Sequence, residues 1–170
     1  MKKFTLFFSA LMQCIISVSG QTIIPILQAR AQPAGSTVTI RGIILNDASK
    51  MGWTYYIQDE SGGIAGYSTV FSDKGAKPGD IVTVTGTLKN YNSLLEISPV
   101  QSVTIVSSNN TLPDPIALSI NEIITGTGGE DNEATLVKIT NVQFAAADQG
   151  KPFSGGSSGF NYNVTDEDIN

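Results

Sequence analysis

Five short apolar runs between residues 36 and 106 constrain the fold of this chain more than any other feature. Each run alternates apolar and polar residues with the two-residue period of a β-strand. Glycine- and asparagine-containing turns follow the runs, for example at residues 60–63 and 90–93, and residues 72–80 read as a loop. No helical stretch is long enough for a parallel crossover. We therefore predict an all-β fold, a small closed barrel of five strands.

The glycines and one proline within these runs predict where the strands bend. In the first run the alternation passes from Val38 and Ile40 to Ile43 and Leu45, so we expect a phase slip and a bulge at Gly42. Gly86 marks a second bend, and Pro99 a kink in the fifth strand. The remaining alternating positions are Trp53, Tyr55 and Ile57 in the second run, Ile64 to Tyr67 in the third, and Ile81, Val82, Val84 and Leu88 in the fourth.

The first two strands recur later in the chain. The pattern Val38-x-Ile40-x-Gly42 matches Val137-x-Ile139-x-Asn141 at an offset of 99 residues. The pattern Tyr55-x-Ile57-x-Asp59-Glu60 matches Tyr162-x-Val164-x-Asp166-Glu167 at an offset of 107. Ser119 and Glu122 have capping-box spacing, which predicts a short helix before the second copy. The alternative is chance similarity between β-rich segments.

The repeat suggests four segments. They are a signal peptide at 1–20, a barrel with a short N-terminal helix at 21–106, a linker at 107–115, and an incomplete second unit at 116–170. Because a two-stranded ribbon is not stable alone, we expect the sequence to be a fragment that continues beyond residue 170.

The first twenty residues have the pattern of an export signal. Lys2 and Lys3 precede an apolar stretch, and Val18-Ser19-Gly20 provides a small-residue cleavage site. The apolar stretch is shorter than the roughly 20 residues that a membrane span needs. A lipoprotein anchor at Cys14 is disfavoured, because Ile15 and Ile16 follow it directly. We therefore predict an exported protein, in the periplasm, at the cell surface or secreted, with no membrane span after cleavage.

Composition excludes much common catalytic chemistry. The chain has no histidine, and its one cysteine is Cys14. Ser-His-Asp triads, Cys-His pairs and the usual zinc sites are thus excluded. Cleavage after Gly20 would also remove Cys14, so no disulfide could stabilise the mature fold. We predict no enzymatic activity, no cofactor and no metal.

Two groups of acidic residues are candidates for catalysis or for binding a metal ion. Asp59 and Glu60 are adjacent on a strand and would point to opposite faces, which makes them a poor acid–base pair. We expect Asp59 to accept backbone hydrogen bonds in the turn that follows. Residues 130–133 could offer oxygen ligands to Ca²⁺, but they lack the alternating spacing of an EF-hand loop, so a solvated acidic loop is favoured.

The segments "AGSTVTIRGIIL", "YYIQDESGGIAGY" and "KPGDIVTVTGTL" resemble OB-fold domains of exported bacterial surface proteins, some of them extracellular nucleases. The later segments "ATLVKITNVQF" and "NYNVTD" resemble the second such domain of Bacteroidetes-type secreted proteins. The resemblance covers residues 22–106 and, in part, 116–170. It implies an OB barrel with an accessory role, the catalytic domain lying elsewhere.

OB barrels bind ligands across strands 2 and 3, between the loops that join strands 1 to 2 and 4 to 5. These loops correspond here to residues 46–52 and 89–93. An exposed tyrosine beside a lysine can stack a base or a sugar ring. The alternative is that the strand aromatics only pack in the core or at its rim. The candidate ligand-binding residues are Tyr56, Gln58, Tyr67, Lys50, Lys89 and Tyr91.

Charge argues against tight binding of a polyanion. Without Lys2 and Lys3 the chain has eight basic residues against 15 acidic ones. Residues 36–106 are nearly neutral, whereas residues 107–170 have two lysines against nine carboxylates. Few phosphates could be neutralised, so we expect nucleic-acid binding to be weak or absent. The partner is unknown, and an oligonucleotide or an oligosaccharide bound with weak affinity is the ligand class considered. Three functions therefore stay open: a non-catalytic binding module, a nucleic-acid-positioning domain of a secreted nuclease, and a carbohydrate-binding or adaptor module.

Overall fold

The computed structural model describes residues 22–48, 52–125, 132–146, 148–150 and 163–165. The predicted signal peptide and Lys50 lie outside these residues. In the described part of the chain, no helix has both the length and the apolar character that a membrane crossing requires.

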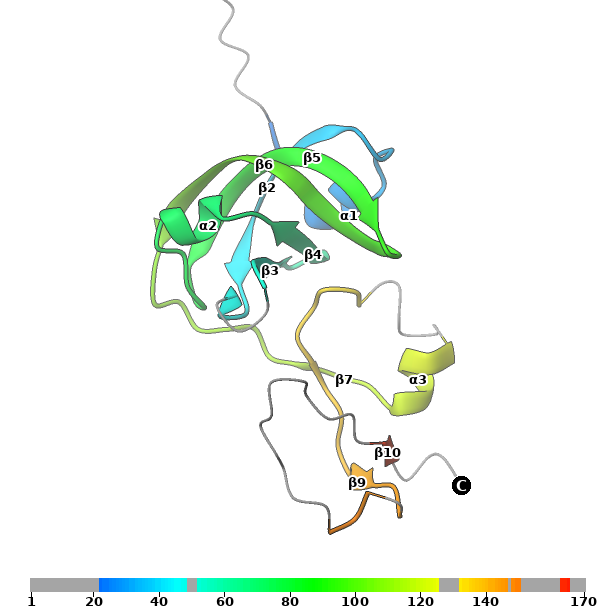
Figure 1. Ribbon diagram of the computed structural model, residues 1–170. Coiled ribbons are helices and arrows are strands. Elements are labelled where there is room, and N and C mark those ends of the chain that lie inside the picture. Colours follow the sequence, from blue (N-terminus) through cyan, green and yellow to red (C-terminus); the bar gives the residue numbers. More distant parts are fainter. Residues whose placement is uncertain (1–21, 49–51, 126–131, 147, 151–162, 166–170) are drawn as a thin grey trace, which may run out of the picture.

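A closed barrel forms the larger part of the structure (Figure 1). Its strands follow the order β2-β3-β4-β6-β5, and β5 pairs again with β2 to close the barrel. Neighbouring strands are antiparallel except for β4 and β6, which are parallel. This order is that of an OB-fold, so the predicted all-β, five-stranded OB-like barrel is confirmed. The strands are β2 (Thr37–Ile44), β3 (Thr54–Asp59), β4 (Gly62–Tyr67), β5 (Ile81–Tyr91) and β6 (Leu94–Ser107).

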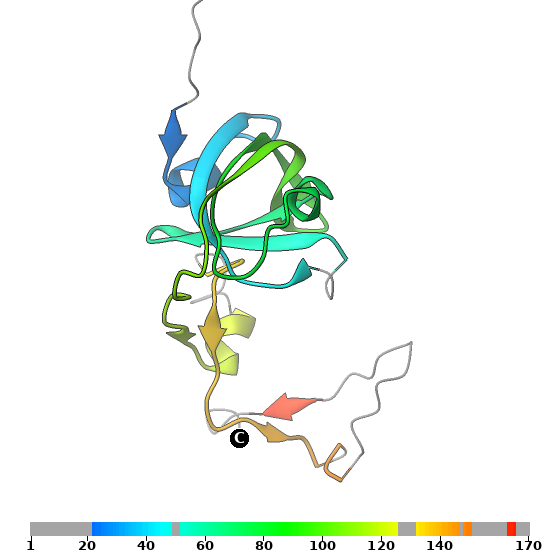
Figure 2. The same cartoon turned by 90° about the vertical axis from the view of Figure 1, so that its left-hand side faces the viewer.

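Two short helices lie at opposite sides of the barrel and add to its core (Figures 1 and 2). The helix α1 (Ile26–Arg30) follows β1 (Ile23–Ile24) and buries Ile26 completely. The helix α2 (Val70–Asp73) buries Phe71, whose ring stacks on Tyr55 with the centroids 4.5 Å apart. Gly66 makes room for this ring, because a Cβ at position 66 would lie 2.8 Å from Phe71 Cζ.

The first barrel strand contradicts one sequence prediction. Its inward positions continue from Ile40 through Gly42 to the fully buried Ile44, whereas Ile43 and Leu45 are only partly buried. The pairing of β2 with β5 also keeps one register through Gly42. The predicted phase slip is therefore wrong. Gly42 is needed because β3 crosses close by: a Cβ there would lie 2.7 Å from the carbonyl oxygen of Gln58.

The other predicted bends are confirmed. The register of β5 against β6 shifts on both sides of Gly86, where a Cβ would lie 2.6 Å from the carbonyl oxygen of Pro99. On β6, Pro99 lies between Ile97 and Val100, the partners at which the register shifts. The hairpin then turns at Asn92 and Ser93, both with positive φ. These irregularities bend the long hairpin so that it wraps around the core.

Where the structure describes residues between 116 and 165, they form short local pairings (Figure 2). The strand β7 (Ile116–Ala117) pairs in parallel with β8 (Val137–Lys138), and α3 (Ile120–Thr125) lies between them in the chain. The strand β9 (Gln143–Phe144) pairs antiparallel with β10 (Val164–Thr165). The barrel begins in the same order: β1 is parallel to β2, α1 follows β1, and β2 is antiparallel to β3. This agreement supports the predicted repeat, which stays a prediction.

The predicted capping box at the start of α3 is confirmed. The Ser119 N–H and Oγ–H groups donate to Glu122 Oε2 at 2.8 and 2.9 Å, and the Glu122 N–H donates to Ser119 Oγ at 3.2 Å. These bonds favour the ionised carboxylate. The backbone bond from Ser119, followed by its side-chain bond, lowers the pKa of Glu122 below its ordinary value of 4.5.

Candidate ligand-binding face

The outward side of the β3–β4 hairpin corresponds to the surface that binds ligands in OB-folds. Tyr55 and Ile57 are buried in the core, so the alternating residues of β3 point outward. The cross-strand pairs on this outward side are Thr54 with Tyr67, Tyr56 with Ala65, and Gln58 with Gly63. We call these six residues the β3–β4 face. Three of the six predicted site residues, Tyr56, Gln58 and Tyr67, therefore lie on one face.

The other hairpin extends this face through a row of paired residues. Tyr56 on β3 pairs with Ala65 on β4, Ala65 with Glu96 on β6, and Glu96 with Lys89 on β5. Lys89 Nζ lies 4.0 Å from Glu96 Oε1 and 5.1 Å from the ring centroid of Tyr91. The predicted residues Lys89 and Tyr91 thus contact each other at the hairpin end, and Lys89 is joined to the β3–β4 face through a buried carboxylate. Lys50 lies outside the described residues.

Trp53 was predicted to alternate with Tyr55 within a strand, and the structure corrects this. Trp53 precedes β3, has a φ of 73° and is 47% exposed. Its carbonyl oxygen accepts a hydrogen bond from the N–H of Ser68, which places it beside the end of β4 and the 46%-exposed Tyr67. Sequence reasoning missed this exposed aromatic because its spacing continues the strand pattern. The preceding Gly52, also with positive φ, was the available sign of a turn.

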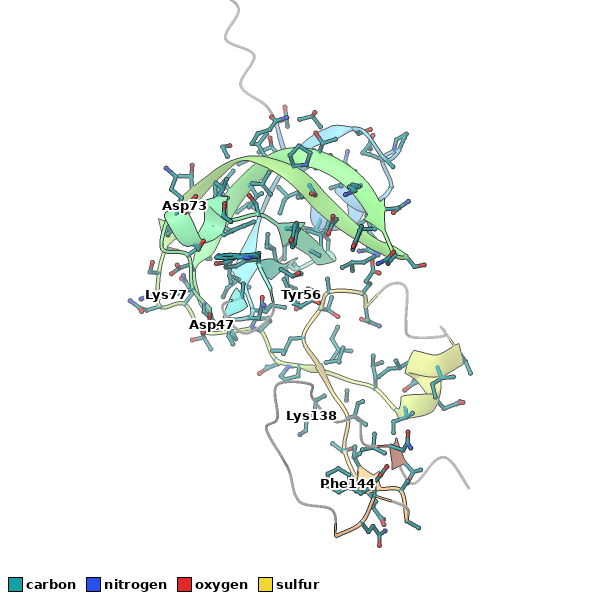
Figure 3. The ribbon with its side chains drawn as sticks, viewed as in Figure 1. Asp47, Tyr56, Asp73, Lys77, Lys138 and Phe144 are labelled. Atoms are coloured by element: carbon teal, nitrogen blue, oxygen red, sulfur yellow. The ribbon has the colours of Figure 1, made fainter. Side chains whose placement is uncertain are left out.

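Part of the β3–β4 face is covered by the chain itself. Residues 132–136, which we call the covering segment, pass along it on the way to β8 (Figure 1). The Leu136 N–H donates to Gln58 Oε1 at 2.8 Å, and only 9% of Gln58 is exposed. Figure 3 shows Tyr56 on the side of the barrel nearest to this part of the chain, with Lys138 and Phe144 further along it. The open part of the face is therefore the end with Trp53 and Tyr67.

Carboxylates neutralise two cations at this surface. Arg30 Nη2 lies 2.9 Å from Glu133 Oε2, and Arg30 Nη1 donates to the carbonyl oxygen of Gly63 at 3.1 Å. Lys89 lies opposite Glu96, which is only 4% exposed. Neither Arg30 nor Glu133 was among the predicted site residues, because nothing in the sequence indicated that segments 103 residues apart would meet. A polyanion would have to compete with both carboxylates for these cations.

A groove of about 710 Å³ adjoins the face at Gln58. Arg41 is among the lining residues, and its Nε donates to Thr83 Oγ1 at 3.3 Å. Asp59, Glu60 and the linker residues 110, 111 and 113 also line the groove. Its volume is in the range of small-molecule sites, but it is open to solvent and has charges of both signs. The groove is therefore an open surface next to the β3–β4 face, which it adjoins at Gln58.

Asp59 has the structural role that its position predicted. Its Oδ1 accepts hydrogen bonds from the N–H groups of Ser61 and Gly62 at 2.7 and 3.1 Å. Its Oδ2 accepts from the N–H of Ile26, which joins the turn to the start of α1. The described residues contain no cluster of His, Cys, Asp or Glu suited to a metal ion. Of the acidic run at 130–133, residues 130 and 131 lie outside the described part, and Glu133 contacts Arg30.

Comparison with known proteins gives one strong sequence similarity. The chain is 42% identical to Endonuclease YhcR of Bacillus subtilis (strain 168) over 135 residues, which is 75% of this chain and 10% of that protein. The aligned share is larger than the barrel alone, so the similarity extends into residues 116–170. No family model matches the chain. The chain is thus similar to a segment spanning about a tenth of an endonuclease.

Among solved structures, the hypothetical protein ygiW from E. coli is 23% identical. That match covers 50% of this chain and 90% of the other, with a TM-score of 0.43. The assignment of an OB-like barrel rests on strand order and pairing. The predicted resemblance to OB-fold domains is thus confirmed at the level of a generic OB-like domain that is similar to a segment of an endonuclease. The predicted resemblance to Bacteroidetes-type secreted proteins stays a prediction.

Proposed function

We propose that this chain is a non-catalytic accessory module of an exported nuclease, in which the OB barrel positions single-stranded nucleic acid. The observation that carries the proposal is the 42% identity to a segment making up a tenth of an endonuclease. A segment of that size, with no histidine, is suited to holding a substrate for a catalytic domain elsewhere. The β3–β4 face supplies the surface on which OB barrels hold a strand.

The residues of the face suit weak, sequence-tolerant binding. Tyr56 and Tyr67 offer ring faces, and base stacking on such rings contributes about 1–3 kcal/mol per base. Lys89 contributes one positive charge at the edge of the face. With so few cations, we expect micromolar affinity at low salt that weakens only gradually as salt is added, because the salt dependence scales with the number of phosphates neutralised.

Fluorescence anisotropy of labelled single-stranded DNA at low salt tests this proposal. We expect Tyr56→Ala and Lys89→Gln each to weaken binding several-fold, because one removes a stacking ring and the other a charge. Lys74→Gln is the matched control, since Lys74 follows α2 and is not one of the face residues, and the same charge is removed. Absence of saturable binding, or equal losses for Lys89→Gln and Lys74→Gln, would contradict the proposal.

An oligosaccharide is the second candidate ligand, favoured by the exposure of Trp53 and Tyr67 next to each other. A sugar ring stacks on aromatic side chains without phosphate contacts, so the paired state of Arg30 and Lys89 would not oppose it. Tryptophan fluorescence reports directly, because Trp53 is the one tryptophan in the chain. A saturable change with neutral oligosaccharides but not with DNA would favour this second candidate.

A further inference from the structure

The covering segment makes three separate contacts with the β3–β4 face and its edge. Glu133 pairs with Arg30, the backbone of Ala134 lies against Gly63, and the N–H of Leu136 donates to Gln58. A turn shapes the segment: the N–H of Thr135 donates to the carbonyl oxygen of Asn132 at 3.1 Å, and Ala134 has a φ of 63°. One contact is made by a side chain and two by the backbone, so the segment is held against this surface between residues 133 and 136.

Gly63 is the residue that permits this fit. A Cβ at position 63 would lie 2.3 Å from the carbonyl oxygen of Ala134 and 2.7 Å from the nitrogen of Thr135. Both are backbone atoms, so no side-chain rotation could relieve the clash. Within the barrel, by contrast, position 63 is an ordinary β4 position paired with Gln58. A side chain at position 63 would therefore exclude the covering segment while leaving the strand pairing intact.

Arg30 is held in a geometry suited to an oxyanion. One guanidinium nitrogen is fixed by the carbonyl oxygen of Gly63 at 3.1 Å, and another meets Glu133 Oε2 at 2.9 Å. The side chain of Arg30 is only 16% exposed, so its orientation is restricted. Arginine binds carboxylate and phosphate oxygens with the same planar set of donors. The oxygen of Glu133 therefore lies where a phosphate oxygen could lie.

The side chain of Gln58, like that of Arg30, has its bonding partner in the covering segment. Its Oε1 accepts from the N–H of Leu136 at 2.8 Å, although a side-chain amide is also suited to the edge of a nucleobase. Gln58 and Gly63 are paired across β3 and β4, and Arg30 bonds to Gly63, so the three residues are neighbours. The covering segment thus provides the bonding partner of the Arg30 guanidinium and of the Gln58 side-chain amide, which lie on the same surface.

We propose that Arg30 and Gln58 form a phosphate-and-base subsite on the β3–β4 face, and that Glu133 and the covering segment occupy it until a single-stranded nucleic acid displaces them. This inference rests on the proposed function and adds a subsite and its internal competitor. Displacement exchanges a carboxylate for a phosphate at Arg30 and frees the Gln58 amide for a base. It also predicts weaker binding by the intact chain than by a chain whose segment is released, because each bound strand must first displace the segment.

Two variants release the segment by different means. Gly63→Ala introduces the clash with the backbone of residues 134 and 135, and Glu133→Gln removes the charge that pairs with Arg30. We expect each to tighten the binding of a labelled oligothymidylate by about three- to tenfold at low salt. Glu122→Gln is the matched control for the loss of a negative charge, because Glu122 lies on α3 and is bonded to Ser119. Arg30→Gln in the Gly63→Ala background should remove the gain.

Hydrogen exchange of the Leu136 amide reports on the covering segment directly, both without a ligand and with DNA bound. We expect the amide to be protected in the unmodified chain, to exchange faster in Gly63→Ala, and to exchange faster in the unmodified chain once DNA is bound. Circular dichroism melting of Gly63→Ala checks that the barrel itself is intact.

The possible results separate the two proposals. If the unmodified chain binds DNA while Leu136 stays protected at saturation, or if Gly63→Ala and Glu133→Gln bind no more tightly than Glu122→Gln, the inference fails and the proposed function stands. If neither the unmodified chain nor the folded Gly63→Ala variant binds at low salt, both fail.

Discussion

The barrel and residues 116–165 begin with the same order of local pairings but differ in what they bury. In the barrel, Ile40 and Ile57 have no exposed surface. At the matching positions of the predicted repeat, Ile139 is only partly buried and Val164 is 42% exposed. Val137 and Phe144, on the neighbouring short strands, are each 37% exposed. Similar alternation thus produces a buried core in the barrel, whereas these residues in the described part of the second region stay partly or largely exposed.

The difference shows what completes the core of this fold. In the barrel, β5 and β6 cover the side chains of β2 and β3, and their pairing back to β2 closes the sheet. In residues 116–165, the described strands have only two residues each and pair locally. Two-stranded pairings of this kind contribute little stability in water. The first strands of an OB unit therefore specify local order, and the closing hairpin provides most of the burial.

Matched truncations in the two regions are expected to give the largest contrast. Ile57→Ala should lower the free energy of unfolding of the barrel by about 2–5 kcal/mol, because it leaves a cavity in a closed core. Val164→Ala should change it by less than about 0.5 kcal/mol, because that side chain is already 42% exposed. Urea unfolding followed by Trp53 fluorescence measures both. Equal losses would mean that residues 116–165 share the cooperative core of the barrel.

The sequence predicted the part of the structure that depends on local pattern. The five strands, the bends at Gly86 and Pro99, and the capping box at Ser119 follow from residue alternation and turn chemistry, and the structure has them, although Trp53 lies before β3 and not within it. Gly42 shows the limit of this reasoning. A glycine between apolar residues predicts a bulge, whereas Gly42 is required by the close approach of the paired strand β3, which is a tertiary contact.

The candidate site was predictable to a similar extent. Alternation placed Tyr56, Gln58 and Tyr67 on the same face, because Tyr55 and Ile57 had to point inward. The pairing of Arg30 with Glu133 could not be predicted, because those residues are 103 positions apart and the acidic run that contains Glu133 does not indicate a partner. Gly63 was read as part of a turn, and its approach to Ala134 appears only when the two regions are seen together.

Alkaline pH should lower the stability of the barrel through Tyr55, by less than the loss expected for Ile57→Ala. Burial, partly offset by a hydrogen bond with Ser72 and reinforced by the nearby Asp47 and Asp73, raises the pKa of Tyr55 above its ordinary value of 10.0. The folded barrel thus holds the phenolic proton more tightly than the unfolded chain. Stability should be unaffected by this group below pH 10 and should fall as the pH rises from about 10 through the raised pKa.

Urea midpoints of the unmodified chain and Tyr55→Phe at pH 8, 9, 10 and 11 test this effect. The unmodified chain should lose more stability than Tyr55→Phe between pH 10 and 11, because phenylalanine has no proton to release. The matching residue of the predicted repeat, Tyr162, serves as the control through Tyr162→Phe; it lies outside the described residues. Parallel pH curves for all three proteins would show that Tyr55 does not contribute.

The smallest expected effect is confined to the start of α3. Because hydrogen bonds from Ser119 lower the pKa of Glu122, their stabilisation of α3 is present above pH 4.5 and is lost as the pH falls through the lowered value. Ser119→Ala removes the hydroxyl but keeps the backbone N–H, the larger cause, so the pKa of Glu122 should rise only part of the way to 4.5. A carboxyl ¹³C titration measures this rise, and an identical pKa in both proteins would contradict the capping contact. The melting temperature of the barrel should stay unchanged, because this capping box lies outside the closed core that Ile57 helps to form.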